Sequence, residues 1–196
     1  MRSLAFLERA GFHVSPYKIV KSFDDAVGYA NKIGYPVVMK LSSEEHKTDI
    51  GGVILDIYTD KMLGAAWHYF ENKFKGREVM VQKQIKEGIE LYAGIKYDDS
   101  FGTILLFGLG GIYIEIFKEI ETRLCPINKE EAEEMINELK VGKLLNKRGK
   151  TFNKDALINF LVKLSKIAVE KNIKEMDINP FKLEKECIII DARLIK

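Results

Sequence analysis

Several features are scarce in this 196-residue chain, and each shortage excludes a class of protein. It has two cysteines, Cys125 and Cys187, in apolar, strand-like surroundings and outside any CxxC pair, so we expect neither a zinc site nor a disulfide framework. The 31 Lys and Arg nearly balance 29 Asp and Glu, and a net charge of +2 argues against binding nucleic acid through a basic surface. No apolar run reaches membrane-spanning length and no signal-peptide pattern follows Met1, so we predict a cytoplasmic protein.

The composition that remains is that of an ordinary folded domain, with 46% hydrophobic and 31% charged residues. The length fits one large domain or two small lobes, and the chain has no internal repeats and no low-complexity linker. Strand-like and helix-like segments are mixed, with hairpins in the second half instead of strict alternation, which predicts the α+β class. Because the pattern changes near residues 81–85, we predict an N-terminal lobe over 1–80 and a C-terminal lobe over 81–196.

Hydrophobic periodicity and capping residues define the expected elements. Ser22, Asn128 and Asn153 are the expected N-caps of three helices. The predicted helices span 4–10, 22–33, 61–74, 128–139 and 153–170. The predicted strands span 17–20, 36–40, 53–57, 78–84, 90–97, 103–107, 113–117 and 122–124.

The last twenty residues are predicted to form two strands joined by a polar turn at 184–186. A three-residue loop pairs Leu183 with Cys187, Asn179 with Asp191 and Asp177 with Arg193. Facing amide and carboxylate oxygens are donors that Mg²⁺ accepts while it keeps water and phosphate in the rest of its shell. An even-length loop would put Asn179 and Asp191 on opposite faces. A buried hairpin with one polar cross-strand pair is the alternative, and this segment alone favours it.

Lys40 ends an apolar predicted strand, where a lysine reaches an anion at the sheet edge or extends to solvent. The loop that follows contains His46 and the glycine pair Gly51 and Gly52. Paired glycines let backbone N–H groups close on a phosphate, and a tight entry into the next strand explains them equally well. A loop histidine is more often solvated, but beside phosphates it can donate a hydrogen bond or accept a phosphoryl group.

A second glycine cluster, Gly108, Gly110 and Gly111, follows the apolar strand that ends at Phe107. No helix follows it, so it is not a dinucleotide-binding fingerprint, but it indicates close approach to the backbone or a positive φ. A lysine, two glycine loops and a candidate Mg²⁺ pair together make up the inventory of a nucleotide phosphate site. Catalysis at such a site consists mostly of positioning and charge neutralisation.

Motifs along nearly the whole chain resemble the ATP-grasp module of the ADP-forming acyl-CoA synthetase family, and as an ordered set they are highly specific. They are Gly34-Tyr35-Pro36-Val37-Val38-Met39-Lys40, His46-Lys47-Thr48-Asp49-Ile50-Gly51-Gly52-Val53, Phe101-Gly102, Phe107-Gly108-Leu109-Gly110-Gly111-Ile112 with Glu115, Arg123 with Pro126, Arg148-Gly149, Met176-Asp177-Ile178-Asn179-Pro180-Phe181 and Asp191-Ala192-Arg193. The resemblance implies an ATP-grasp fold whose two lobes clamp ATP or ADP with Mg²⁺.

The resemblance also implies a function as the nucleotide-binding beta chain of an acetyl-CoA or other acyl-CoA synthetase, an acid–thiol ligase. Acyl-CoA, ADP and phosphate would become acid, CoA and ATP through an acyl phosphate and a phosphohistidine. A separate alpha subunit would carry the CoA site and the main phosphorylated histidine, and the pair would form an α2β2 heterotetramer. We therefore expect activity only in the presence of that subunit.

The resemblance also implies roles for individual residues. It implies phosphate contacts from Lys40, Gly51 and Gly52, adenine contacts from the backbone near Val81, Gln82 and Lys83, a nucleotide contact from Glu90, a phosphate loop at Gly110 and Gly111, Mg²⁺ ligands in Asn179 and Asp191, and phosphoryl relay by His46. The stretch between Lys40 and His46 is shorter than the family pattern and lacks its proline, which favours a second hypothesis, a non-catalytic regulatory or nucleotide-binding subunit. A carboxylate–amine ligase is disfavoured, because the chain has no substrate lobe.

Overall fold

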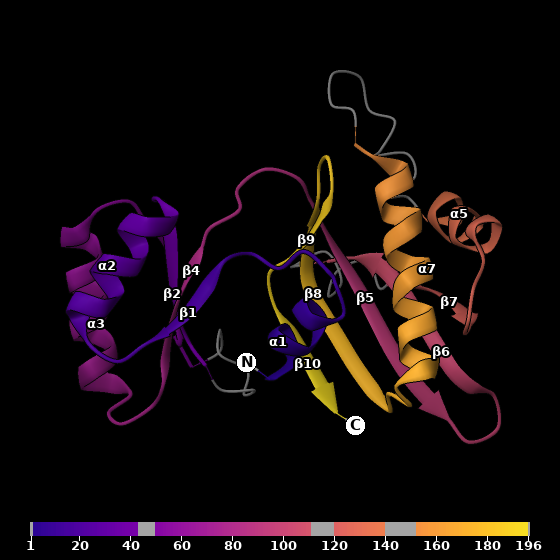
Figure 1. The fold of residues 1–196 in the computed structure, drawn as a ribbon, viewed down its shortest axis with the longest axis horizontal. Helices are drawn as coiled ribbons and strands as arrows, with labels where there is room; N and C mark the ends of the chain where they lie inside the picture. Colours follow the sequence, from indigo (N-terminus) through magenta and orange to yellow (C-terminus); the bar gives the residue numbers. More distant parts are fainter. Residues whose placement is uncertain (1, 43–49, 111–119, 140–151, 196) are drawn as a thin grey trace. The chain divides into compact units, whose positions relative to one another are not determined.

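The computed structural model describes residues 2–42, 50–110, 120–139 and 152–195, and the chain divides into two compact units (Figure 1). Unit 1 is Ser15–Lys86, and unit 2 consists of Arg2–Val14 together with Glu87–Lys196. This division differs from the lobes predicted at 1–80 and 81–196 in two places. The boundary lies after residue 86, because the strand at Val79–Lys83 pairs within unit 1, and the N-terminal helix belongs to unit 2.

The described part of unit 1 is a four-stranded antiparallel sheet with two helices packed on it. Its elements are β1 (Tyr17–Val20), α2 (Phe23–Ile33), β2 (Val37–Leu41), β3 (Val53–Ile57), α3 (Asp60–Lys73) and β4 (Val79–Lys83), and the strand order is β1-β4-β2-β3. Ala26 and Ala30 of α2 and Phe70 of α3 are buried in the core beneath them. Figure 1 shows α2 and α3 side by side on one side of this sheet.

The described part of unit 2 contains a larger antiparallel sheet, with strand order β10-β8-β5-β6-β7 and β9 paired to β8. Its elements are α1 (Arg2–Arg9), β5 (Ile89–Asp98), β6 (Gly102–Leu109), β7 (Ile120–Leu124), α5 (Lys129–Glu138), α7 (Lys154–Glu170), β8 (Glu175–Leu183), β9 (Cys187–Ile189) and β10 (Ala192–Ile195). The mixture of helices with antiparallel sheets confirms the predicted α+β class. The strand predicted at 113–117 lies outside the described residues.

Local capping sets where the helices begin, as predicted. The side chains of Ser22, Asn128 and Asn153 accept hydrogen bonds from backbone N–H groups in the first turns of α2, α5 and α7. Asn128 and Glu131 form a complete capping box. Helix α3 begins at Asp60, because Thr59 is its N-cap.

The sheet of unit 2 has a helix-covered face, which α7 crosses in Figure 1. Phe160 of α7 stacks on Phe181 of β8 with ring centroids 4.5 Å apart, and Phe12 meets Phe160 edge-on at 5.2 Å. Because Leu91 pairs with Phe181 and side chains alternate along a strand, Tyr92, Gly94 and Lys96 of β5 point to the opposite face. We call this second side of the sheet the open face.

Strand β8 carries a bulge at residues 179–180. Leu91 pairs with Phe181 and Ala93 pairs with Ile178, so β8 has one residue more than β5 between these pairs. The bulge allows Met176 and Ile178 on one side of it, and Phe181 and Leu183 on the other, all to be buried.

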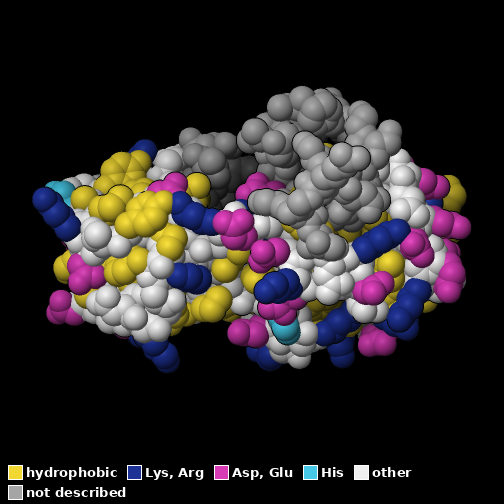
Figure 2. Space-filling model, turned by 90° about the horizontal axis from the view of Figure 1, so that it is seen from above, with side chains coloured by type: hydrophobic (Ala, Val, Ile, Leu, Met, Phe, Trp, Pro, Cys, Tyr) yellow, Lys and Arg dark blue, Asp and Glu magenta, His cyan; other side chains and the backbone are white. Residues whose placement is uncertain are grey.

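Acidic and basic side chains are interspersed over the face of the molecule seen in Figure 2, in keeping with the small net charge. Among the described helices, none combines the length and the apolar composition needed to cross a bilayer.

Candidate functional site

The C-terminal hairpin has the predicted register. Leu183 pairs with Cys187, and Asp177 pairs with Arg193. Between these pairs, the backbone N–H of Asn179 donates to the carbonyl oxygen of Asp191 at 3.1 Å. The three-residue turn therefore brings Asn179 of β8 opposite Asp191, which lies in the break between β9 and β10.

The facing pair has the donor chemistry of a magnesium site. The side chain of Asn179 is exposed and that of Asp191 is partly exposed, and Oδ1 of Asp191 accepts from the backbone N–H of Ala192 at 3.1 Å. An amide oxygen and a carboxylate fit Mg²⁺, which takes one or two protein oxygens and completes its shell with water and phosphate. Within the described ranges, no group of three or more His, Cys, Asp or Glu side chains could hold a metal ion, so an ion here would depend on water or a nucleotide for its other ligands.

Tyr92 and Asp177 form a polar pair on the open face, close in sequence to Asn179. The hydroxyl of Tyr92 donates to Oδ1 of Asp177 at 2.9 Å. Burial, and after it the Asp177 carboxylate, raise the pKa of Tyr92 above its ordinary value, so the hydroxyl stays protonated and remains a donor. The sequence predicts the pairing of Asp177 with Arg193, but it gives no sign of the contact between Asp177 and Tyr92. An isolated glycine at position 94, inside a strand pattern, was the signal that could have revealed a close approach there.

Lys40 is buried in the sheet of unit 1, with 4% of its surface exposed. Its neighbours Met39 and Leu41 point into the core beneath the helices, so Lys40 points to the opposite face of the sheet. The alternative in which Lys40 extends into solvent is therefore wrong. An ammonium group largely removed from water attracts an anion more strongly than a solvated one does.

The backbone N–H and C=O groups of Val81 and Gln82 take part in the hydrogen bonds of the sheet of unit 1. Strand β4 lies between β1 and β2, and both residues pair with both neighbours. The Val81 side chain is in the core, and Gln82 Nε2 donates to the Ser15 carbonyl at 3.4 Å. The predicted backbone contacts to adenine at these two positions would require ladder hydrogen bonds to break, so the geometry does not favour them.

Lys83 also has structural partners. Its Nζ donates to the carbonyl oxygens of Gly34 and Tyr35 at 2.8 and 2.9 Å, and its backbone N–H donates to Pro16 at 2.8 Å. Its carbonyl oxygen accepts from the hydroxyl of Ser15 at 2.6 Å. These contacts hold β4 to the segments before β1 and β2.

Packing and backbone geometry, without any ligand, explain why glycine occupies the described positions of the two loops. Gly51 has a φ of +72°, and a Cβ there would lie 2.8 Å from the hydroxyl of Tyr69. Gly52 accepts from the backbone N–H of Leu41 at 2.9 Å, as a tight entry into β3 requires. A Cβ on Gly110 would lie 2.6 Å from the backbone carbon and oxygen of Leu91.

Of the remaining predicted site residues, Glu90 is described by the structure, whereas His46 and Gly111 are not. Glu90 pairs across β5 and β8 with Lys182, whose Nζ lies 3.3 Å from Oε1 of Glu90. His46 and Gly111 lie outside the described residues, so their predicted roles in phosphoryl relay and phosphate binding stay predictions.

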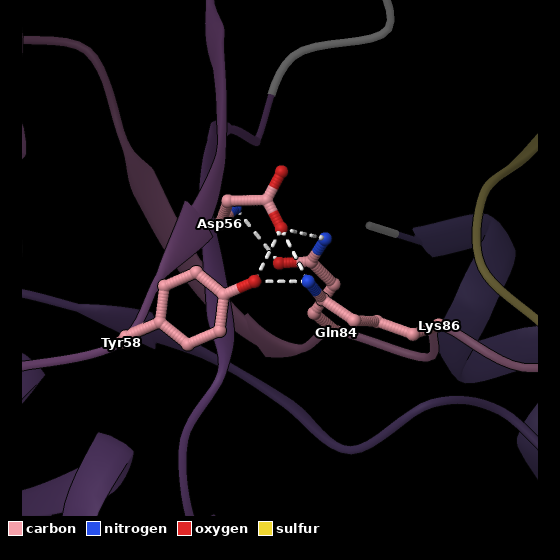
Figure 3. A network of polar contacts seen from close by, with 4 residues as sticks. All are labelled: Asp56, Tyr58, Gln84 and Lys86. Carbon is pink, nitrogen blue, oxygen red and sulfur yellow. Dashed lines mark hydrogen bonds and ion pairs between the residues drawn. The ribbon is translucent and has the colours of Figure 1, made fainter.

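A further polar network lies on unit 1, between β3 and the residues that follow β4 (Figure 3). Asp56 has a positive φ of 58°, its N–H donates to Oε1 of Gln84 at 2.8 Å, and its Oδ1 accepts from Gln84 and from Tyr58 at 3.1 Å. Lys86 lies 2.8 Å from the same carboxylate oxygen and also donates to Tyr58. Lys86 is the largest cause of a lowered pKa at Asp56, ahead of Tyr58. Asp56 lies where the register between β2 and β3 shifts by one residue, so the network ties the residues after β4 to this irregularity in the edge strand β3.

A protein-family model described as an ATP-grasp domain matches residues 1–195. The chain belongs to the ATP-grasp family. A relative from Pyrococcus furiosus, named acetate–CoA ligase (ADP-forming) I subunit beta, is 38% identical over 202 residues, which cover 96% of this chain and 87% of the relative. Acetate–CoA ligase (ADP-forming) II from Archaeoglobus fulgidus is 35% identical over 98% of this chain, which spans only 29% of that protein.

Two solved structures are similar to this chain over nearly its whole length. PH1788 from Pyrococcus horikoshii Ot3 superimposes with a TM-score of 0.87 and 36% identity, over 96% of this chain and 86% of the other. The dinucleotide forming acetyl-coenzyme A synthetase 1 of Ca. Korarchaeum cryptofilum has a TM-score of 0.84 and 32% identity, over 97% of this chain and 88% of that one. That structure contains coenzyme A and Mg-AMPPCP, and its phosphohistidine segment points towards the nucleotide binding site. These comparisons confirm the resemblance to the ADP-forming acyl-CoA synthetases.

Proposed function

We propose that this chain is the nucleotide-binding beta subunit of an ADP-forming acetyl-CoA or acyl-CoA synthetase. The observation that carries the proposal is the pairing of Asn179 with Asp191 within an ATP-grasp fold, where the backbone N–H of Asn179 donates to the carbonyl oxygen of Asp191 at 3.1 Å and so places an amide residue opposite a carboxylate residue. The Pyrococcus relative supports a separate subunit, because it has nearly the same length and is itself named a beta subunit. The Archaeoglobus relative supports a partner, because this chain matches less than a third of it.

The reaction assigned to this chain is transfer of a phosphoryl group between a phosphohistidine and ADP. The nitrogen–phosphorus bond breaks, and a bond forms between phosphorus and an oxygen of the β-phosphate of ADP, giving ATP and a free imidazole. Mg²⁺, when bound, neutralises charge on the phosphates. Asn179 and Asp191 would hold that ion, and the buried ammonium of Lys40 is suited to attract a phosphate. Positioning and charge neutralisation are what such a transfer requires of a protein.

The partner in this proposal is an alpha subunit that binds CoA and carries the phosphorylated histidine, in an α2β2 complex in the cytoplasm. The purified chain should convert no acetyl-CoA alone, and addition of the alpha subunit should restore formation of ATP. Turnover by the purified chain alone would contradict the subunit assignment. His46→Ala in the reconstituted complex tests the regulatory alternative, because a regulatory chain would lose little turnover.

Magnesium binding is tested directly by Asp191→Asn. The amide removes the charge of one ligand, so Mg²⁺-dependent binding of ADP should weaken by at least about tenfold while the melting temperature stays unchanged. Calorimetric titration of the purified chain measures this, and Asp99→Asn, at an exposed turn, is the matched control. Equal Mg²⁺ affinity in Asp191→Asn and wild type would remove Asp191 from the site.

A further inference from the structure

Asp177 lies in a cross-strand row on the open face of unit 2. It pairs with Gly94 on β5 and with Arg193 on β10. It also precedes Asn179 by two residues on β8, and its partner Arg193 of β10 follows Asp191 by two residues. A half-buried carboxylate therefore lies beside the candidate magnesium pair.

Tyr92 reaches Asp177 by lying along its own strand, above Gly94. A Cβ on Gly94 would collide with the hydroxyl of Tyr92 and lie 2.9 Å from its Cζ. The glycine therefore leaves the space that the tyrosine ring occupies, and the hydroxyl ends 2.9 Å from Oδ1 of Asp177. Gly94 has no positive φ, so its backbone does not require glycine, and the ring of Tyr92 is the side chain that an alanine there would meet.

The spacing suits indirect contact with a metal. Residues two apart on a strand are separated by roughly 6.5 Å along the strand axis. A carboxylate at that distance is too remote to share an ion bound at Asn179. It is within reach of a water on that ion, since Mg²⁺ holds water at about 2.1 Å and the water donates over about 2.8 Å.

We propose that Tyr92 is a positioning residue for the water shell of the magnesium site, acting through Asp177. Tyr92 occupies one oxygen of the carboxylate and fixes its plane, and the other oxygen accepts a hydrogen bond from a water on the ion held by Asn179 and Asp191. Mg²⁺ keeps several waters, and groups that orient a metal's ligands change its affinity by about 10–100-fold. This inference rests on the proposed function, because it requires that Mg²⁺ binds at the pair.

Two substitutions break the contact by different routes. Tyr92→Phe removes the donor and leaves the ring, whereas Gly94→Ala leaves the hydroxyl and displaces the ring. Each should weaken the affinity of the full chain for Mg²⁺ in the presence of ADP by about tenfold, and leave ADP binding without metal unchanged. The double variant should lose no more than either single one, because both remove the same interaction. Tyr97→Phe is the matched control on the same strand, where Lys174 covers the ring at 3.5 Å.

The test measures the Mg²⁺ affinity of each variant in the presence of ADP by titration calorimetry, together with its melting temperature. Weaker Mg²⁺ binding by Tyr92→Phe at an unchanged melting temperature supports the inference, since a purely structural role would not alter metal affinity alone. Wild-type Mg²⁺ affinity in Tyr92→Phe overturns it and leaves the proposed function intact. If Gly94→Ala does not fold, Tyr92→Phe alone gives the answer. Failure of the wild-type chain to bind Mg²⁺ with ADP overturns the proposed function, and this inference with it.

Discussion

Substitution of Gly110 by alanine separates two explanations of the glycine run after β6. If Gly110 serves only a phosphate, an added methyl group should reduce nucleotide affinity and leave stability unchanged. The structure predicts the opposite. The new Cβ would lie 2.6 Å from the carbonyl group of Leu91, where ordinary contact begins at 3.4 Å, so the backbone of β5 would have to move by about 0.8 Å.

Moving this backbone destabilises the folded state, because Leu91 is fully buried and β5 is flanked by β6 and β8. Overpacking of this kind costs about 1–3 kcal/mol, and we expect the upper end because a backbone and not a flexible side chain is in the way. For a chain of this size, a loss of about 3 kcal/mol lowers the melting temperature by roughly 6–12 °C.

Thermal unfolding followed by circular dichroism measures the effect. Gly28→Ala is the control, because a Cβ there meets nothing within 4 Å inside helix α2. Alanine should stabilise that helix by up to about 1 kcal/mol. An unchanged melting temperature for Gly110→Ala, combined with weaker ADP binding, would refute the packing explanation and favour the phosphate loop.

Two further predictions concern the thiols and the network on unit 1. Burial raises the pKa of Cys125 and Cys187 from 9.0 to about 12, so at pH 8 their thiolate fraction should be roughly a thousandfold below that of an unperturbed thiol. A disulfide reagent should therefore label both cysteines slowly in the native chain and quickly after unfolding. Fast labelling of the native chain would contradict this prediction. Asp56→Val should lower the melting temperature more than Asp56→Asn, because valine tolerates a φ of +58° poorly and asparagine adopts it readily. The folded state lowers the pKa of the Asp56 carboxyl below 3.8, so the ionised carboxylate should make the wild type more stable than Asp56→Asn above pH 3.8. This difference in stability should disappear as the pH falls below that value. A difference that does not change with pH would show that the charge of Asp56 is not involved.

Local signals in the sequence predicted much of this protein. The caps at Ser22, Asn128 and Asn153 were correct because capping depends on a few consecutive residues. The hairpin register was correct because the length of a turn determines which residues face each other. The motifs also identified the ATP-grasp family, because several short stretches in a given order are far more specific than any one of them.

Contacts between residues far apart in sequence were decided by the tertiary structure. Tyr92 and Asp177 are 85 residues apart, and no periodicity within β5 or β8 shows that the two strands are neighbours. The structural roles of Gly110 and Lys83 also depend on which segment lies next to them, Leu91 in one case and Gly34 with Tyr35 in the other. A sequence pattern shows which side of an element is apolar, whereas the partner packed against it is set only when the whole chain folds.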